Sequence, residues 1–558
     1  METPRAPDTP NPDERAINED VGVWEAEAFE AGEEPTPKPS AGRLARSTAF
    51  FSIATAASRV AGLAREVVAA GYYGISGPMS AFTIAFQVPN LIRALFADAA
   101  LQPAFVPVFT ELLGKKDYKE AFRLASTMLL LVTMVLGTIT ALFVLFAPVL
   151  MPLFAPGFKD NQQLLDLTVS LSQVLFPILV LLGVSGIVVG ILNSYDRFGA
   201  FAISPLFWNL TIILVLVVLE PMFEGQDRIY AYAIGILVGT AVQLLIPAWD
   251  LRHTPFRFSF SFDWRSPKVR RVLVLMLPVT ISLGLINFNL LINSFFGSLV
   301  SEQAPAAIDK AFRIYQLPQG IFSVAIATVL FPTLARFANA GEIDDLRATM
   351  ANGMRQILFV LVPAAAAILV LSDPMIRLIY QRGAFDAHET EVVATALFWF
   401  AFSLPTNGLF LLLTRTFFSL QKPWIPTWIS AGNLVVTALA ALGLYHLGVG
   451  GIVASTAIAT TASVVAQGVV LRRILHGLEL GRLLSAALRI SIAAAGLAAI
   501  GWIVWDVLDE LLGRGLGGQI VSLGVGLAAG LAVYLSVAKL LRVAELEQMS
   551  RLLLRRGR

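Results

Sequence analysis

Five basic side chains lie inside stretches that are otherwise apolar enough to cross a lipid bilayer. An uncompensated cation in the middle of a membrane costs roughly 2.5 to 3.5 kcal/mol on insertion scales. Five cations, each with this free-energy cost, indicate that the charges serve a function. The simplest physical account is a water-filled cavity within the membrane, lined with positive charge and suited to an anionic solute. The five residues are Arg59, Arg65, Arg93, Lys310 and Arg313.

The side-chain types narrow the class of anion. The planar arginine fork can hold two phosphate oxygens at once, and it does not lose its proton on burial. A diphosphate would therefore engage several of these groups together. The alternative is that the cations pair with nearby carboxylates or extend to an interface, and Lys310 fits that alternative best. Three carboxylates, however, are too few to neutralise five cations: Glu66, Asp98 and Asp309.

Signatures of enzymes and of nucleic-acid binding are missing. The sequence has no G-x-x-x-x-G-K-[ST] loop and no H-E-x-x-H motif, and its four histidines are far apart. With no cysteine, disulfides, thiolate nucleophiles and cysteine metal sites are excluded. The alternating aromatic run at 257–264 is expected at the membrane interface, where it links two parts of the chain. We therefore expect no enzyme, no cofactor and no nucleic acid.

Composition predicts an all-α polytopic membrane protein. Hydrophobic residues make up 56% of the 558 residues and charged residues 14%, whereas soluble domains carry about 25% charged residues. The acidic, proline-rich residues 1–42 are expected to form a disordered tail rather than a signal peptide. Taking about 20 residues as one crossing, we expect 14 transmembrane helices: 48–72, 79–110, 124–152, 165–193, 200–220, 229–249, 272–300, 305–335, 346–371, 389–416, 424–444, 450–471, 485–506 and 517–541.

Charge in the loops predicts the orientation, because cytoplasmic loops carry the excess of Lys and Arg. Leaving out the first 42 residues and the five membrane cations, 28 basic residues fall on the side of the N-terminus and five on the other. This asymmetry predicts 14 crossings with both termini in the cytoplasm. The five outer residues are Lys159, Arg228, Arg377, Arg382 and Arg514.

The chain also repeats itself at an offset of 224 to 229 residues. The Gln87/Pro89 pair recurs as Gln316/Pro318, and Asn209 recurs as Asn433. An offset of six segments preserves orientation, so we expect two parallel six-helix lobes followed by two C-terminal helices, with the substrate between the lobes. The expected divisions are a tail at 1–42, an N-lobe at 43–250, an interfacial linker at 251–271, a C-lobe at 272–475, the last two helices at 476–545 and a basic tail at 546–558.

Position along the segments gives each cation a depth. At 1.5 Å per residue, Arg59 is roughly 18 Å into its segment, and Arg93 is similarly deep, so both are expected near the midplane. Arg65, Lys310 and Arg313 are expected in the outer half. Breaks at proline and glycine mark candidate hinges in the cavity wall, although static kinks for packing are an equal alternative. These hinge positions are Pro89, Pro318 and Gly320.

Several spaced motifs resemble the MurJ (MviN) lipid II flippase family, within the multidrug/oligosaccharidyl-lipid/polysaccharide exporter superfamily. The similarity covers roughly residues 45 to 545. It rests on the runs SRVAGLARE (58–66), AFQVPNLIRALFA (85–97), AFVP (104–107), APGF (155–158), GILN (190–193) with RF (197–198), and RIYQLPQG (313–320).

The resemblance implies a pair of lobes that open alternately to each side of a bacterial inner membrane. It implies that Arg59, Arg65, Arg93 and Arg313 bind the diphosphate and head group of lipid II, and that the last two helices form a groove for the polyprenyl tail. The family often has Asp where this chain has Ser80, which we count among the candidate gating positions. Relatives with a sodium site use a carboxylate that 272–300 lacks, which leaves Asn433 and Thr437 as weak candidate cation ligands.

The expected function is therefore flipping of an undecaprenyl-diphosphate-linked peptidoglycan precursor, driven by membrane potential or by a monovalent cation. Lipid II and the bilayer are the expected partners, with cell-wall synthesis proteins as further candidates. Alternatives are an exporter of another polyprenyl-linked glycan, an exporter of cationic drugs, which a positive cavity disfavours, and a membrane scaffold for wall synthesis. A membrane glycosyltransferase is the least supported, because no paired acidic motif is evident.

Overall fold

The computed structural model describes residues 41–96, 101–260 and 262–547, with side chains described in these ranges except at 41–52, 93–96, 101–103 and 277–287. Every regular element in the described part is helical. The long helices are α2 (Ala41–Tyr73), α3 (Gly77–Phe96), α4 (Leu101–Gly114), α5 (Tyr118–Phe154), α6 (Gln162–Leu175), α7 (Ile178–Ser194), α8 (Gly199–Leu219), α9 (Ile229–Leu251), α10 (Pro267–Val300), α11 (Ala304–Pro318), α12 (Val324–Ala340), α13 (Ile343–Tyr380), α14 (Ala387–Ser419), α15 (Trp424–Leu444), α16 (Val449–Ile474), α17 (Leu480–Leu512) and α18 (Leu516–Leu540).

The all-helical membrane fold expected from composition is confirmed. In the described residues, 11 helical spans are long and apolar enough to cross a bilayer. Within the described residues, all 14 predicted segments coincide with helix, but three of them, at α2, at α3 with α4, and at α10, are not among those 11 spans. The count of 14 crossings stays a prediction. The expected tails, 1–42 and 546–558, lie almost wholly outside the described residues.

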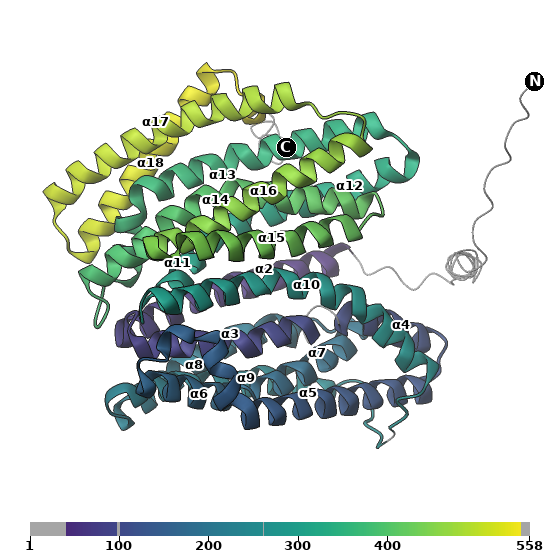
Figure 1. The fold of residues 1–558 in the computed structure, drawn as a ribbon. Helices are drawn as coiled ribbons and strands as arrows, with labels where there is room; N and C mark the ends of the chain where they lie inside the picture. The colour runs from purple at the N-terminus through teal and green to yellow at the C-terminus, as the bar shows by residue number, and fades with distance from the viewer. Residues whose placement is uncertain (1–40, 97–100, 261, 548–558) are drawn as a thin grey trace, which may run out of the picture. The chain divides into compact units, whose positions relative to one another are not determined.

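The helices after α2 form two groups that follow the order of the chain. Helices α3 to α9 pack mainly against one another, and so do α11 to α16, while α10 contacts both groups (Figure 1). The connection from α9 to α10 runs through residues 252–266, where the amides of Ser259 and Asp263 donate to the hydroxyls of Ser126 and Thr127 on α5. The side chain of Phe260 on this connection is 93% exposed.

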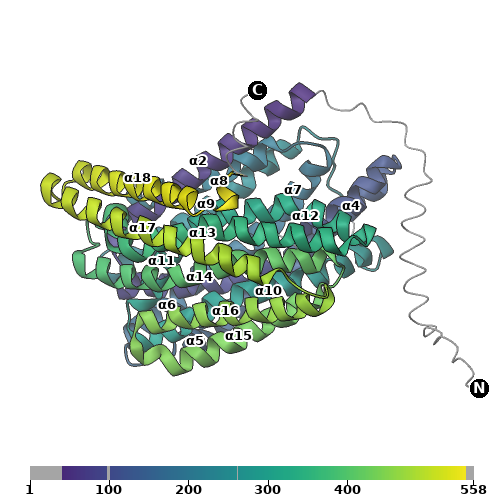
Figure 2. The same cartoon turned by 90° about the horizontal axis from the view of Figure 1, so that it is seen from above.

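Helices α17 and α18 lie side by side and pack on α13 (Figure 2). Small residues let their backbones approach closely. A Cβ added to Gly526 would lie 2.9 Å from the carbonyl oxygen of Gly501. On the α13 side, the Tyr534 hydroxyl donates to the Phe359 carbonyl oxygen at 2.5 Å. The expected pair of C-terminal helices is thus a tightly packed hairpin that is fixed to the second group.

One arginine that the sequence placed in a loop is instead buried inside a helix. Arg377, expected in an outer loop, lies inside α13 and is 7% exposed. Its guanidinium pairs with Asp509 on α17, and the indole of Trp505 lies 5.8 Å away. The ion pair explains how a cation is accommodated there, because a buried charge needs a partner that is also buried.

The two repeated asparagines each form a hydrogen bond with the first helix of their own half of the chain. Asn209 on α8 donates to the Ser58 carbonyl oxygen of α2 at 3.4 Å, and Asn433 on α15 accepts from Asn289 of α10 at 3.0 Å. Each asparagine thereby bonds to the first helix of its own half. This correspondence agrees with the internal repeat.

The predicted break in the eighth segment is present. Helix α11 ends at Pro318, and a π-helical turn at Gln319–Ser323 (η4) leads into α12. A π turn removes regular i→i−4 bonding, which is a common feature of functional sites in helices. Pro89, by contrast, lies within a continuous α3. Whether either position moves stays a prediction.

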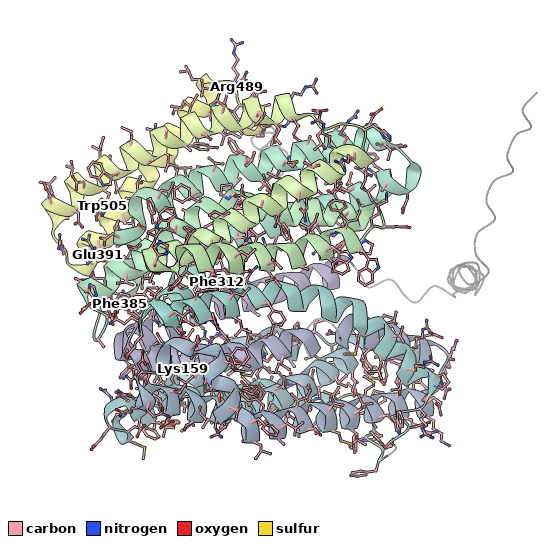
Figure 3. The ribbon with its side chains drawn as sticks, viewed as in Figure 1. Lys159, Phe312, Phe385, Glu391, Arg489 and Trp505 are labelled. Carbon is pink, nitrogen blue, oxygen red and sulfur yellow. The ribbon has the colours of Figure 1, made fainter. Side chains whose placement is uncertain are left out.

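The two groups meet through several hydrogen bonds at the end predicted to be outside. The Ala306 amide donates to the Ser80 hydroxyl at 3.1 Å, and the Ala384 amide donates to the Gly71 carbonyl oxygen at 2.8 Å. Close approach at the second contact requires glycine at 383, where φ is +63° and an added Cβ would lie 2.3 Å from the Gly71 carbonyl oxygen. Phe385 and Glu391, near this junction, are labelled in Figure 3.

Further contacts extend the same junction. The Ile75 amide donates to the Glu389 carboxylate at 3.0 Å, and the Gly157 amide donates to the Ser298 hydroxyl at 3.2 Å. Asn161 donates to Glu302 at 3.0 Å. The junction, defined here as the contacts of 71–80 and 157–161 with 298–306 and 383–389, holds the two groups together at this end.

Candidate functional site

A cavity of about 730 Å³ lies between the two groups of helices. Its walls come from α2, α3, α7, α8 and α9 on one side and from α10 and α11 on the other. The lining residues include Arg65 and Arg313 from the predicted set of cations. Phe312, which also lines it, is labelled in Figure 3. The volume falls in the range of roughly 300 to 1,000 Å³ that is typical of small-molecule sites.

Glu66 joins two of the predicted arginines at the cavity. Its carboxylate accepts from Arg65 Nη2 at 2.5 Å and lies 3.3 Å from Arg313 Nε. Arg313 also pairs with Asp309, one helical turn away, at 2.9 Å. Glu66 is 4% exposed, whereas the Arg313 side chain is 35% exposed. The sequence left open that these cations pair with carboxylates, and Arg65 and Arg313 do so. Arg313 nevertheless remains accessible from the cavity.

Arg65 retains unused donors despite this pairing. Among the described residues its Nε and Nη1 have no hydrogen-bond partner, although the side chain is almost wholly buried. Its guanidinium lies 4.6 Å from the ring centroid of Trp208 on α8. A buried guanidinium with free N–H groups can bind an additional anion, because each unmade bond to a charged donor is costly.

Lys310 lies behind the cavity wall rather than in it. It is fully buried, and its Nζ has no hydrogen-bond partner among the described residues. The ring of Tyr380 is 5.3 Å from that nitrogen. Lys310 is not among the residues that line the cavity, so direct contact with a solute there would require rearrangement.

The other two predicted cations are not brought to this cluster by the described structure. Arg59 is exposed and is not a lining residue. Arg93 lies on α3, but its side chain is outside the described residues. A spacing of six residues turns a helix by about 240°, which leaves Arg59 and Arg65 about 120° apart. That angle, available from the sequence, explains why only one of them faces the cavity.

Sequence reasoning missed the neutral part of the cavity wall. These residues are aromatic or carry amide and hydroxyl groups, and their apolar surroundings gave no signal comparable to a charge in a membrane segment. They include Gln87, Trp208, Asn209, Tyr232, Thr240 and Gln243.

Asn433 and Thr437, the weak candidates for a cation site, already have protein partners. Asn433 donates to Ser463 at 2.9 Å and accepts from Asn289, while Thr437 donates to the Asn433 carbonyl oxygen at 2.9 Å. In the part of the chain that the structure describes, no group of three or more His, Cys, Asp or Glu residues could hold a metal. A role in ion coupling at this position stays a prediction.

Replacing Glu66 by glutamine is expected to destabilise the protein. The change removes the shared anion from two arginines, and breaking a buried ion pair costs about 3 kcal/mol or more. Thermal unfolding of the purified protein measures the effect. The matched control is Glu111→Gln, because Glu111 also contacts two cations, Lys115 at 2.8 Å and Arg271 at 3.0 Å, but is exposed. That change is expected to cost less than about 1 kcal/mol. Equal shifts for both variants would contradict the role given to Glu66.

Comparison with known proteins identifies the family. The family model for the lipid II flippase MurJ matches residues 69–517. This chain belongs to the MurJ lipid II flippase family. A probable lipid II flippase MurJ of Rhizobium meliloti (strain 1021) is 33% identical over 89% of this chain and 93% of its own length. The lipid II flippase MurJ of Burkholderia cenocepacia is 30% identical over 71% of this chain and 77% of its own length.

Solved structures confirm the fold. A lipid II flippase MurJ in an inward closed conformation superimposes with a TM-score of 0.72 at 22% identity, covering 88% of this chain and 98% of that one. An inward-facing multidrug resistance transporter of the MATE family, within the MOP superfamily, gives a TM-score of 0.61 at 16% identity, covering 75% and 94%. This MurJ-family chain is thus a multi-span membrane protein with the transporter fold implied by the sequence motifs.

Proposed function

We propose that this MurJ-family chain is a lipid II flippase: a transporter, not an enzyme, that moves the undecaprenyl-diphosphate-linked precursor from the cytoplasmic to the outer leaflet by alternating access. The observation that carries the proposal is that Arg65 and Arg313, from different halves of the chain, both line one cavity. Two guanidinium groups can hold the oxygens of a diphosphate more specifically than a single cation can.

The N–H groups of Arg65 and Arg313 are the proposed donors to the diphosphate. Nε and Nη1 of Arg65 have no hydrogen-bond partner in the described residues, and Arg313 is partly exposed to the cavity. The diphosphate would bond to these donors and compete with Glu66 and Asp309 for Arg313. Because these carboxylates already balance part of the positive charge, the cavity is stable while it awaits substrate. Arg59 and Arg93 remain candidates for contact in other states of the cycle.

Closure of the junction at the predicted outer end suits a state that receives substrate from the cytoplasm. In the next step of the cycle, the two groups of helices would separate at the junction and close at the other end. Pro318, Gly320 and the π turn would accommodate part of the change in backbone direction. The polyprenyl tail would remain in the bilayer beside α17 and α18. Both termini would lie in the cytoplasm of a bacterial cell, with the protein in the inner membrane.

Membrane potential is the simplest driving force for this cycle. Each elementary charge that crosses 100 mV is worth about 2.3 kcal/mol. With the cell interior negative, the loaded site moves outward with little net charge because the diphosphate offsets the arginines, and return of the positive empty site toward the cytoplasm is favourable. Coupling to a monovalent cation is the alternative.

Outer-leaflet lipid II in flippase-depleted bacteria tests the function. We expect expression of the full chain to restore growth and to restore lipid II that an externally added lipid II-cleaving toxin can reach. A chain lacking residues 1–40 tests the scaffold alternative, in which the tail recruits cell-wall synthesis proteins. Rescue by the truncated chain would support transport. Failure of the well-expressed full chain would contradict the flippase proposal and favour another polyprenyl-linked glycan.

A further inference from the structure

Three neighbouring helices of the second group are interrupted part-way along. Helix α11 ends at Pro318 in the π turn η4. Helix α13 has non-helical backbone angles at Leu371, with φ −119° and ψ 19°. Helix α14 contains Pro405, whose ring removes one backbone hydrogen bond. Prolines and π turns are the usual places where helices bend. The three interrupted helices also pack together, since α14 contacts both α11 and α13.

The interruptions separate an outer block from the rest of the second group. The block is defined here as residues 304–318 and 372–404, which form the ends of α11, α13 and α14 nearest the junction. Three of its residues bond across the junction: Ala306, Ala384 and Glu389. A displacement of this block would therefore open these contacts together.

The outer block also carries one of the two arginines at the cavity. Arg313 belongs to α11, whereas Arg65 and Glu66 belong to α2. The Nε atom of Arg313 lies 3.3 Å from the Glu66 carboxylate, so this ion pair is a further contact between the block and the opposite side of the cavity. Movement of the block away from α2 would open the junction and separate the two guanidinium groups in one step. A diphosphate held by both would then lose one of its ligands as the outer side opens.

Asn407 forms hydrogen bonds across the break. It lies on α14 just inside the proline, and its Oδ1 accepts from Gln319 Nε2 in the π turn at 2.7 Å. The same amide interacts with the hydroxyl of Tyr315, which is on the block. One residue further on, a Cβ added to Gly408 would lie 2.9 Å from Ser323 Oγ, so the π turn packs closely on α14. Asn407 thus fixes the break in the form that it has while the junction is closed.

We propose that residues 304–318 and 372–404 swing as one block about these interruptions, and that Asn407 is the positioning residue that holds the block closed. The proposal rests on the proposed function, because alternating access requires the junction to open. It differs from a movement of two rigid groups, since the second group bends within itself. Ser403 offers a contrast, because its hydroxyl donates to the Tyr315 hydroxyl at 3.2 Å within the block and would keep this bond during the movement.

Distances between spin labels in the full chain in nanodiscs test the hinge, and the lack of natural cysteine permits labelling at chosen sites. All three labelled positions are exposed. Lys159→Cys with Glu391→Cys spans the junction, and both residues are labelled in Figure 3. Asn339→Cys with Glu391→Cys lies within the second group, on either side of the interruptions. In Asn407→Leu the ratio of open to closed populations is expected to rise about fivefold for both pairs, the effect of losing about one hydrogen bond.

A second variant and a matched control make the test specific. Gln319→Leu removes the same hydrogen bond from its other side, so it is expected to give a similar shift, and the double variant little more than either change alone. Ser403→Ala removes a hydrogen bond that stays within the block, and its distances are expected to match those of the parent. Unchanged distances in Asn407→Leu, or an equal shift in Ser403→Ala, would overturn the role of Asn407.

The two label pairs separate the hinge from the underlying function. A shift in the junction pair without a shift in the second-group pair would overturn the hinge, because the group then moves rigidly. Flipping of lipid II in proteoliposomes by the parent would leave the proposed function intact in that case. A chain that bends as described but does not flip lipid II would instead contradict the proposed function and leave the hinge standing.

Discussion

Arg313→Ala is expected to weaken lipid II binding by about 30-fold or more and to prevent rescue of flippase-depleted bacteria. Removal of one partner from a desolvated, hydrogen-bonded charge pair costs about 2 to 5 kcal/mol, and about 1.4 kcal/mol corresponds to a factor of ten. Arg313 contributes a guanidinium to the cavity from α11 and shares the Glu66 carboxylate with Arg65 of α2. Growth and toxin-accessible lipid II measure the loss in cells, and binding in nanodiscs measures it directly.

A conservative variant and a distant one make this prediction specific. Arg313→Lys keeps the charge but not the planar fork, so binding is expected to fall between parent and Arg313→Ala. Arg336→Ala removes an exposed arginine from α12 and is expected to behave as the parent does. If well-expressed Arg313→Ala still rescues growth, the arginine is structural, and the scaffold alternative gains weight.

A disulfide between Ser80→Cys and Ala306→Cys is expected to stop transport almost completely. The Ala306 amide donates to the Ser80 hydroxyl at 3.1 Å, so the two backbones are close enough for a bridge, which needs Cα atoms within about 7 Å. The bridge would hold the outer junction closed, and alternating access requires that junction to open. Flipping in proteoliposomes before and after oxidation measures the effect.

The natural sequence simplifies the interpretation, because it contains no cysteine that could form a competing bridge. Each single-cysteine variant is expected to remain active under oxidation. Reductant is expected to restore the double variant, which separates locking from misfolding. Full activity of a quantitatively oxidised double variant would show that the junction does not open during transport.

The helices were predictable because their signal is local. Apolar length marks a membrane helix, and the predicted segment 424–444 agrees with α15 to the residue. The break at Pro318 and Gly320 was also visible in the sequence. The predicted segment 79–110 covers α3 and α4, and residues 97–100 between them lie outside the described residues.

The site was only partly predictable, because hydropathy marks a charge in a membrane segment but not the direction of its side chain. Arg65 and Arg313 line the cavity, whereas Arg59 is exposed and Lys310 is buried behind the wall. Helical angle would have separated Arg59 from Arg65. Packing between distant segments, which puts Trp208 beside Arg65, has no local signal at all.

Transport by the purified chain tests the central claim most directly. Proteoliposomes would contain the full chain and fluorescent lipid II, and a membrane-impermeant quencher would report the fraction of lipid exposed outside over time. We expect the parent to flip lipid II, with Arg65→Ala and Arg313→Ala both slower by about 30-fold or more. A parent no faster than protein-free liposomes, or alanine variants as fast as the parent, would contradict arginine-dependent flipping.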